Sequence, residues 1–375
     1  MQKSQELKIA LVHDFLNQYG GAEKVLETFC EMFPKAPIFT LLYDPEKMRG
    51  KFSDKKIYTS FLQKFPKFLR KRPKWLLPFF PTAPEIFDLR EYDLIISSSG
   101  AWSKGIVTRL DIKHIAYIHS PMRFVWDYNE KYLKEERKKA FGFLIRPFLS
   151  YLRLWDTLAA DRPDYLIANS KYTKSRIKKY YRRDSEVIYP PIEINNGRIF
   201  KIEAESSKSP ENYFLIVSRL SAYKKIDEAI KAFNELKLPL VIVGEGKEEE
   251  RLKSIAKENI RFLGYLPDEM LSEIYAGARA FVFPGIDDFG MAPAEAMTYG
   301  VPVIAIKKGG ITEVVEEGKS GEFMETSFAR DIIFAVKKFL ENEKNYDENY
   351  IKRSVEKFSK ERFKREIKEF IEKIK

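Results

Sequence analysis

Cysteine and histidine are rare in this chain of 375 residues, which has one cysteine, Cys30, and three histidines. A single cysteine excludes an intramolecular disulfide and a cysteine-rich metal site. Long apolar runs are absent as well, since no stretch reaches the roughly 18 apolar residues that a membrane-spanning helix needs. Residues 1–6 are polar and lack the apolar core of a signal peptide. We therefore expect a cytoplasmic protein without a membrane span.

The chain does contain enough apolar sequence for two domains. Hydrophobic residues make up 44% and charged residues 32% of the sequence, and 375 residues suit two domains of about 150 to 190 residues each. Pro190 and Pro191 stop regular structure, and residues 193–212 are polar. We place the junction there, so that residues 1–192 form the first domain and residues 193–349 the second.

Strand, turn and helix patterns alternate along both halves, as they do in parallel α/β sheets. The apolar runs that predict strands lie at residues 7–14, 92–97, 114–118, 165–169, 213–217, 240–243, 260–266 and 280–283. At the end of the chain, residues 349–375 repeat apolar positions at spacings of three and four, which predicts an amphipathic helix.

The segment 280–299 combines a strand, a glycine turn and a helix with two carboxylates. Asp287 stands in the turn, with Asp288 as an alternative, and Glu295 stands in the helix, where it can accept hydrogen bonds from two ribose hydroxyls. Amides at the start of a helix carry about half a positive charge and can hold a diphosphate without a metal. We expect these amides to come from Phe289, Gly290 and Met291. The competing interpretation is an ordinary turn of an α/β fold.

A second loop carries two cations, Arg219 and Lys224, after the predicted strand 213–217. A diphosphate has about two to three negative charges, and an Arg fork and a Lys point charge neutralise it in complementary ways. Lys225 is close enough to share this role. A solvated helix start is the alternative, but cations there oppose the helix dipole. The loop is thus a candidate anion site.

Glycine turns follow two further strands. Gly244 and Gly246 come after the strand 240–243, and Gly20 and Gly21 precede a predicted helix in the first half. Because glycine has no side chain, a nucleotide can approach such turns closely. Each of these Gly pairs is weak support by itself.

His119 follows the strand 114–118 and stands before a proline, an arginine and a tryptophan, Pro121, Arg123 and Trp126. A histidine at the carboxyl end of a strand is a candidate for catalysis, and packing is its alternative role. His13 and His114 are better explained as structural residues.

Taken together, these motifs resemble the signature of GT-B glycosyltransferases of the retaining family 4. Its pattern of two glutamates separated by seven residues is matched by Asp287 and Glu295, with Asp in place of the first Glu. Its diphosphate-binding Arg and Lys are matched by Arg219 and Lys224. The run from His119 to Trp126 is similar to mannosyltransferase-like members.

The resemblance implies an α/β fold of two Rossmann-like domains that face each other across a cleft, with the helix 350–375 crossing back to the first domain. It also implies that Glu295 holds the ribose, Asp287 contacts the donor sugar and His119 assists at the reacting carbon. The reaction needs no metal or other cofactor and retains configuration. The implied donor is GDP-mannose, and a UDP-hexose would use the same residues. The implied acceptor is a saccharide or lipid-linked glycan, as in polysaccharide biosynthesis.

Residues 51–80 hold much of the net charge of +11. Nine Lys and Arg residues oppose one acid, Asp54, and aromatic residues alternate with them. This composition is typical of a surface that binds the membrane interface, which here is the inner face of the cell membrane. A solvated face is the alternative. We expect no nucleic-acid partner, because no recognised motif accompanies the patch.

Two other functions remain open from the sequence. A sugar-nucleotide epimerase on the same fold would need acid and base carboxylates but no acceptor. A catalytically inactive adaptor at a membrane surface would keep the nucleotide pocket, and the Asp at position 287 keeps this alternative open. The sequence carries no sign of oligomeric state.

Overall fold

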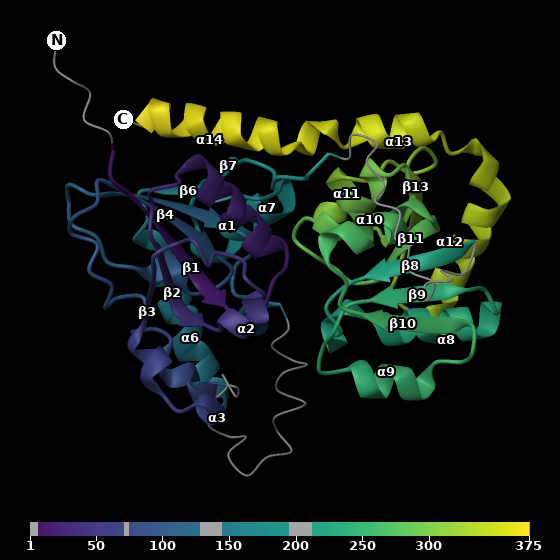
Figure 1. The fold of residues 1–375 in the computed structure, drawn as a ribbon, viewed down its shortest axis with the longest axis horizontal. Coiled ribbons are helices and arrows are strands. Elements are labelled where there is room, and N and C mark those ends of the chain that lie inside the picture. Colours follow the sequence, from purple (N-terminus) through teal and green to yellow (C-terminus); the bar gives the residue numbers. More distant parts are fainter. Residues whose placement is uncertain (1–6, 71–74, 128–144, 195–211, 375) are drawn as a thin grey trace. The chain divides into compact units, whose positions relative to one another are not determined.

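The computed structural model describes residues 7–70, 75–127, 145–194 and 212–374. It divides into two compact units, one of Met1–Tyr189 with Glu366–Lys375 and one of Pro190–Arg365 (Figure 1). The division therefore falls three residues before the expected junction at 192, and the returning segment begins at Glu366 instead of residue 350. The expectations for residues 1–6, for Lys71, Arg72 and Lys74 and for most of the polar junction concern positions outside the described residues.

The first unit is built on a parallel sheet of seven strands in the order β3-β2-β1-β4-β5-β6-β7. Its strands are β1 (Ile9–Leu16), β2 (Ile38–Tyr43), β3 (Ile57–Thr59), β4 (Leu94–Ser99), β5 (Lys113–Ile118), β6 (Tyr165–Ala168) and β7 (Glu186–Val187). Its α-helices are α1 (Gly21–Met32), α2 (Pro45–Met48), α3 (Lys67–Arg70), α4 (Arg123–Trp126), α6 (Ile145–Asp161) and α7 (Lys171–Tyr181). Short 3-10 turns are η1 (Phe61–Lys64), η3 (Leu77–Phe79) and η4 (Ser103–Gly105).

The second unit has a parallel sheet of six strands in the order β10-β9-β8-β11-β12-β13. The strands are β8 (Tyr213–Val217), β9 (Leu240–Val243), β10 (Ile260–Gly264), β11 (Ala278–Phe283), β12 (Val303–Ile306) and β13 (Gly321–Met324). The α-helices are α8 (Ile226–Leu236), α9 (Glu249–Ile255), α10 (Asp268–Ala276), α11 (Met291–Thr298), α12 (Ala329–Asn342) and α13 (Glu348–Ser354). The 3-10 turns are η6 (Ala222–Lys224), η7 (Gly310–Glu313), η8 (Glu343–Asn345) and η9 (Glu356–Phe358).

The central strands are apolar over most of their length because helices cover parallel sheets on both faces. Strand β9 is buried at all four positions. Helix α8 buries the apolar residues whose spacing predicted it, including Ile226, Ile230 and Phe233. The prediction of two parallel α/β sheets is thus confirmed.

Both sheets reverse their strand order at one place, between β1 and β4 in the first sheet and between β8 and β11 in the second. In open parallel sheets, ligands bind beyond the carboxyl ends of the strands at such a switch point. The loops that follow these four strands are therefore candidates for ligand binding.

The carboxyl-terminal prediction was wrong in one respect. Residues 350–375 do not form one helix, because α13 ends at Ser354 and α14 (Lys360–Ile374) begins after η9. Ser359 is extended and forms a parallel bridge to Ile192, which interrupts the helical backbone. The end of α14 belongs to the first unit, where Phe370 packs edge-on against Tyr165 with ring centroids 5.9 Å apart. The expected return to the first domain is confirmed.

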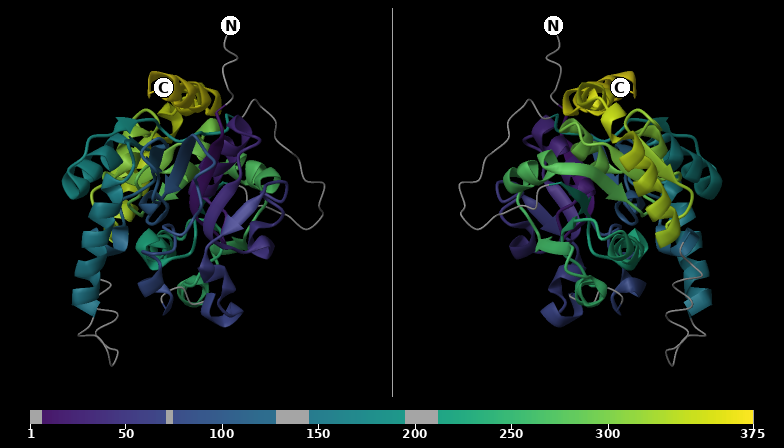
Figure 2. Two further views of the ribbon diagram at one scale, coloured as in Figure 1. Left: turned by 90° about the vertical axis from the view of Figure 1, so that its left-hand side faces the viewer. Right: turned by 90° about the vertical axis from the view of Figure 1, so that its right-hand side faces the viewer.

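Helix α6, which Figure 2 shows from the side, buries one face with Leu149, Leu152 and Trp155.

No helix within the described ranges is long and apolar enough to cross a membrane. In the same ranges, no group of three or more His, Cys, Asp or Glu side chains could hold a metal ion.

Candidate functional site

The loop between β8 and α8 gathers positive charge around one tyrosine. Arg219 is exposed and donates to the Tyr223 hydroxyl at 2.8 Å, and Lys224 Nζ lies 5.2 Å from the centre of the Tyr223 ring. Burial acts to raise the pKa of Tyr223, but Lys224 and Arg219 outweigh it and lower the pKa. The two cations therefore favour the anionic form of the Tyr223 side chain.

Gly244 and Gly246 support this loop from the neighbouring turn. A Cβ on Gly244 would lie 2.0 Å from the carbonyl oxygen of Ser218, and one on Gly246 would lie 2.1 Å from that of Leu220. Only glycine permits such an approach of two backbones. The two glycines thus allow the chain on either side of Arg219 to lie directly against this turn.

The loop between β11 and α11 brings Asp287 to the cationic loop. The Asp287 carboxylate forms an ion pair with Lys224, and the two side chains are 24% and 14% exposed. The backbone of this loop packs on Gly309 and Gly310, where added Cβ atoms would lie 2.4 and 2.0 Å from the carbonyl oxygens of Asp287 and Asp288. Asp288 is itself buried, at 6% exposed. Asp287 is thus the more accessible of the two carboxylates.

Helix α11 begins where the sequence predicted. Gly290 is its N-cap, with a φ of 100° that favours glycine, and Met291 is its first residue. Gly300 follows the helix with a φ of 83°, and its amide donates to Met297 O at 3.0 Å, as expected of a glycine after a helix. The Phe289 ring is buried against Phe358. Any role of Phe289 in binding is therefore confined to its backbone.

Glu295 lies in the middle of α11 and is partly exposed. Its Oε2 accepts a hydrogen bond from the Tyr275 hydroxyl at 3.3 Å. Burial, reinforced by the Glu295 charge, raises the pKa of Tyr275 well above its usual value, so the phenol stays protonated and continues to donate. Tyr275 also stacks on Tyr299 with ring centroids 5.5 Å apart. The carboxylate is therefore oriented by the protein while part of it remains accessible.

In the first unit, the turn after β1 leads directly into α1. Gly20 is the N-cap and Gly21 the first helical residue. Glu23 stands in the first turn of the helix, where an acid is favourable. Its side chain points back to the sheet, since Glu23 Oε1 lies 3.5 Å from His13 Nε2. Glu23 is thus more than a helix-start residue.

Asp14 fixes the loop that follows β4. Its two carboxylate oxygens accept hydrogen bonds from the four successive amides of Gly100, Ala101, Trp102 and Ser103, at 2.6 to 3.0 Å. Hydrogen bonds to a charged acceptor contribute about 1.5–3 kcal/mol each. The carboxyl ends of β1 and β4, on either side of the switch point, are thus joined rigidly.

His119 follows β5 and is a residue of intermediate burial. Nε2 is 2.7 Å from Ser98 Oγ, the backbone carbonyl accepts from Asn169 Nδ2 at 3.0 Å, and the ring meets Tyr117 edge-on at 5.3 Å between centroids. Desolvation by its surroundings, with a smaller contribution from His13, lowers the pKa of His119 to about 3. The imidazole is therefore neutral near pH 7.

The segment after His119 is held by partly buried polar contacts. Arg176 donates to Ser120 Oγ at 2.8 Å and pairs with Asp127. Trp126 donates through Nε1 to Asp156 Oδ2 at 2.8 Å, so its role in the structure is to anchor α4.

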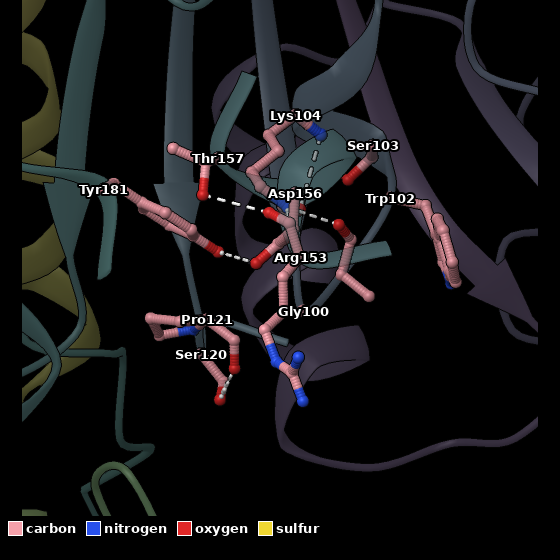
Figure 3. A network of polar contacts seen from close by, with 12 residues as sticks. Gly100, Trp102, Ser103, Lys104, Ser120, Pro121, Arg153, Asp156, Thr157 and Tyr181 are labelled. Carbon is pink, nitrogen blue, oxygen red and sulfur yellow. Dashed lines mark hydrogen bonds and ion pairs between the residues drawn. The ribbon is translucent and has the colours of Figure 1, made fainter. Parts of the chain in front are cut away.

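Figure 3 shows Lys104 and Tyr181 pointing to the same Asp156 carboxylate, at 2.6 and 2.9 Å. Lys104 and Asp156 are 1% and 0% exposed. Removing one partner of a buried ion pair costs about 3–5 kcal/mol. The network therefore joins the β4 loop, α6 and α7 into one support for the His119 segment.

Sequence reasoning located the loops but missed their partners. It predicted Lys224 and Asp287 as separate contacts of the diphosphate and the sugar, and the structure pairs them. It treated His13 as a structural residue and named neither Tyr223 nor Tyr275. An aromatic residue next to a predicted cation site was the one available signal for Tyr223.

Comparison with known proteins agrees with this organisation. Residues 19–196 match the protein family described as "Glycosyltransferase Family 4", and residues 198–357 match the family described as "Glycosyl transferases group 1". An uncharacterized glycosyltransferase of Methanocaldococcus jannaschii is 26% identical over 335 residues, with 79% of this chain and 80% of that protein covered. The O-antigen chain mannosyltransferase B of Escherichia coli is 33% identical over 118 residues, which cover 28% of this chain and 31% of that protein.

Among solved structures, HepE of Anabaena in complex with UDP-glucose is similar with a TM-score of 0.71 and 19% identity, over 98% of this chain and 100% of that chain. At this identity the similarity concerns the fold, which is GT-B. Both halves of the sequence match the same group of enzymes, and the chain therefore belongs to glycosyltransferase family 4, a family of retaining glycosyltransferases.

Proposed function

We propose that the protein transfers a hexose from a nucleotide diphosphate donor onto a saccharide or a lipid-linked glycan. The observation that carries this proposal is the cationic loop after β8, where Arg219 donates to the Tyr223 hydroxyl at 2.8 Å and Lys224 Nζ lies 5.2 Å from the centre of the same ring. This loop and the start of α11 follow β8 and β11, which flank the switch point of their sheet. Two cations and helix amides suit a diphosphate.

In the proposed reaction the bond between the anomeric carbon and the β-phosphate oxygen breaks, and an acceptor hydroxyl oxygen bonds to the same face of that carbon. The acceptor proton passes to the departing phosphate. Negative charge grows on the diphosphate as the bond breaks, and preorganised cations stabilise that charge. We assign this role to Arg219 and Lys224, ribose binding to Glu295, sugar contact to Asp287 and assistance at the sugar to His119.

Gly244 and Gly246 have a supporting role in this proposal. Because the chain fills the space beside them, we assign them to holding Arg219 in place. Gly20, Gly21, Gly290 and Met291 remain assigned to the donor through their backbones, since their turns lead into α1 and α11.

For the donor we propose GDP-mannose. The matched part of the E. coli mannosyltransferase supports this choice, as does the sequence from His119 to Trp126. A UDP-hexose is the second candidate, because the similar Anabaena structure holds UDP-glucose.

A thermal-shift comparison of GDP, UDP and ADP, alone and as sugar conjugates, tests this assignment. We expect GDP and GDP-mannose to raise the melting temperature, because a ligand at one hundred times its Kd adds about 2.7 kcal/mol to the free energy of unfolding. Arg219→Ala removes a residue assigned to the diphosphate, so these nucleotides should raise the melting temperature of this variant less. Stabilisation by UDP compounds would replace the donor. Vesicle binding with no turnover of any donor would favour an adaptor, and a changed sugar without an acceptor would favour an epimerase. No stabilisation by any nucleotide would contradict the donor assignment.

We also propose that residues 51–80 bind an anionic membrane surface, where a lipid-linked acceptor would lie. Phe68, Trp75 and Phe79 are 65%, 67% and 46% exposed. They accompany basic residues of the described part of this segment, Lys51, Lys55, Lys56, Lys64, Lys67 and Arg70. Apolar side chains that insert and basic side chains that attract anionic lipids act together at such surfaces.

Co-sedimentation with vesicles tests the membrane proposal. We expect binding to vesicles that contain phosphatidylglycerol, weaker binding to neutral phosphatidylcholine, and loss of binding at high salt, because the basic residues contribute about 1 kcal/mol each near the surface. Trp75→Ala should reduce binding. Phe334→Ala, which removes an equally exposed aromatic residue (70%) in the other unit, should not. Equal losses in both variants would contradict a specific surface.

A further inference from the structure

Four side chains in the first unit form a continuous polar chain that ends at His119. Glu23 Oε1 lies 3.5 Å from His13 Nε2, His13 Nδ1 lies 3.0 Å from Ser98 Oγ, and Ser98 Oγ lies 2.7 Å from His119 Nε2. Glu23, His13 and Ser98 are 4%, 2% and 1% exposed. These groups come from α1, β1 and β4 and lead to the residue after β5.

The chemistry of the groups orders the hydrogen bonds. An ionised carboxylate only accepts, so His13 Nε2–H donates to Glu23. With His13 neutral, its other nitrogen carries no proton, so His13 Nδ1 accepts a hydrogen bond from the Ser98 hydroxyl. The Ser98 oxygen in turn accepts from His119 Nε2–H. Each donor thus points toward Glu23, and hydrogen bonds aligned in this way strengthen one another.

We propose that Glu23, His13 and Ser98 are positioning residues that hold His119 as the tautomer protonated on Nε2, so that Nδ1 accepts a hydrogen bond from a sugar hydroxyl. The inference rests on the proposed function, in which His119 assists at the sugar. Among the described residues, none hydrogen-bonds His119 Nδ1, and His119 as a residue is of intermediate burial. Because every donor points toward Glu23, the aligned hydrogen bonds increase the electron density on His119 Nδ1. This nitrogen is then a stronger hydrogen-bond acceptor while positive charge develops at the anomeric carbon.

The neighbouring position on β4 supplies a matched comparison. Ser97 Oγ lies 2.8 Å from His114 Nε2, and both residues are fully buried. Ser97→Ala therefore removes a serine–histidine hydrogen bond of the same kind from the same strand. It leaves the chain from Glu23 to His119 intact, so it controls for the cost of the substitution to folding.

The first measurement needs no substrate. Nitrogen-15 spectra of histidine side chains distinguish the two neutral tautomers, and the protein has only three histidines to assign, through His→Gln variants. We expect His119 to be protonated on Nε2 in the wild-type protein and in Ser97→Ala. In Ser98→Ala we expect a mixture of tautomers. A wild-type His119 protonated on Nδ1 would overturn the proposal.

The second measurement is the rate at which the sugar nucleotide selected by the thermal-shift comparison releases its diphosphate. We expect Ser98→Ala to lower kcat about tenfold, the usual effect of losing a second-layer partner, with KM changed little. Glu23→Gln, which removes the anion but retains an acceptor, should also lower kcat. Ser97→Ala should stay within about twofold of wild type, inside the range of a neutral substitution.

The experiments distinguish a wrong positioning role of Glu23, His13 and Ser98 from a wrong role of His119 in the proposed function. If Ser98→Ala alters the tautomer but not kcat, or alters neither, the positioning role is wrong. If His119→Ala retains full turnover, the role of His119 in the proposed function is wrong. The residues that position His119 then have no role in catalysis. The melting temperatures of both serine variants are measured as well, and a cooperative unfolding transition in each would exclude a general loss of structure as the cause.

Discussion

Lys224→Ala is expected to lower kcat for sugar transfer by about 10²- to 10³-fold, the effect of removing one preorganised group that stabilises charge in a transition state. Lys224 stands next to Arg219 and Tyr223 on the cationic loop. Its charge is useful mainly as the diphosphate departs, so kcat should fall more than donor affinity. The melting temperature should change little, because a partly exposed ion pair contributes on the order of 1 kcal/mol.

The control for this variant is Lys231→Ala. Lys231 lies on α8, close in sequence to the loop, and forms an ion pair with Glu228 while 55% of its side chain is exposed. Its removal should leave kcat unchanged. Steady-state kinetics with varied donor, together with thermal unfolding, separate the two variants. Normal turnover in both Lys224→Ala and Arg219→Ala would contradict the assignment of the site.

Glu295→Gln should weaken nucleotide binding by about 10- to 100-fold, because hydrogen bonds to a charged acceptor are worth about 1.5–3 kcal/mol. The protein holds Glu295 through the Tyr275 hydroxyl at 3.3 Å, and glutamine retains the size of the side chain. Since the ribose is bound in the ground state and the transition state alike, the change should appear in KM rather than in kcat.

A comparison of GDP with 2′-deoxy-GDP by calorimetry tests this role at the level of one hydroxyl. The wild-type protein should bind the deoxynucleotide more weakly, and Glu295→Gln should bind both almost equally, because the interaction is absent in each case. Equal losses on removing the hydroxyl in both proteins would show that Glu295 does not contact it. Glu249→Gln, an exposed acid on α9 paired with Lys253, serves as the control.

Local patterns in the sequence were sufficient for much of the fold. Buried strands such as β9 are short apolar runs, and glycines such as Gly290 and Gly300 mark the ends of α11 because their φ values are unfavourable for other residues. Arg219, Lys224 and Asp287 lie in loops that follow β8 and β11, as the sequence predicted, and ligands of parallel sheets bind beyond the carboxyl ends of the strands.

Side-chain partners were not predictable in the same way. The sequence predicted a glycine turn at Gly244, but not that the backbone of Ser218 lies where a side chain on Gly244 would be. The single helix expected over residues 350–375 is interrupted where Ser359 pairs with Ile192. Both outcomes depend on contacts between segments distant in the sequence, which periodicity does not encode.

The sequence by itself determined the two α/β halves, the loops that carry charge and the family to which the chain belongs, because hydrophobic periodicity, turn residues and motif spacing are local properties. Only the tertiary structure decided that Lys224 pairs with Asp287 and that Glu23, His13 and Ser98 lead to His119. These groupings arise when strand order brings separate loops together. Which hydrogen-bonding groups then meet in the interior depends on that packing, since buried polar groups must find partners there.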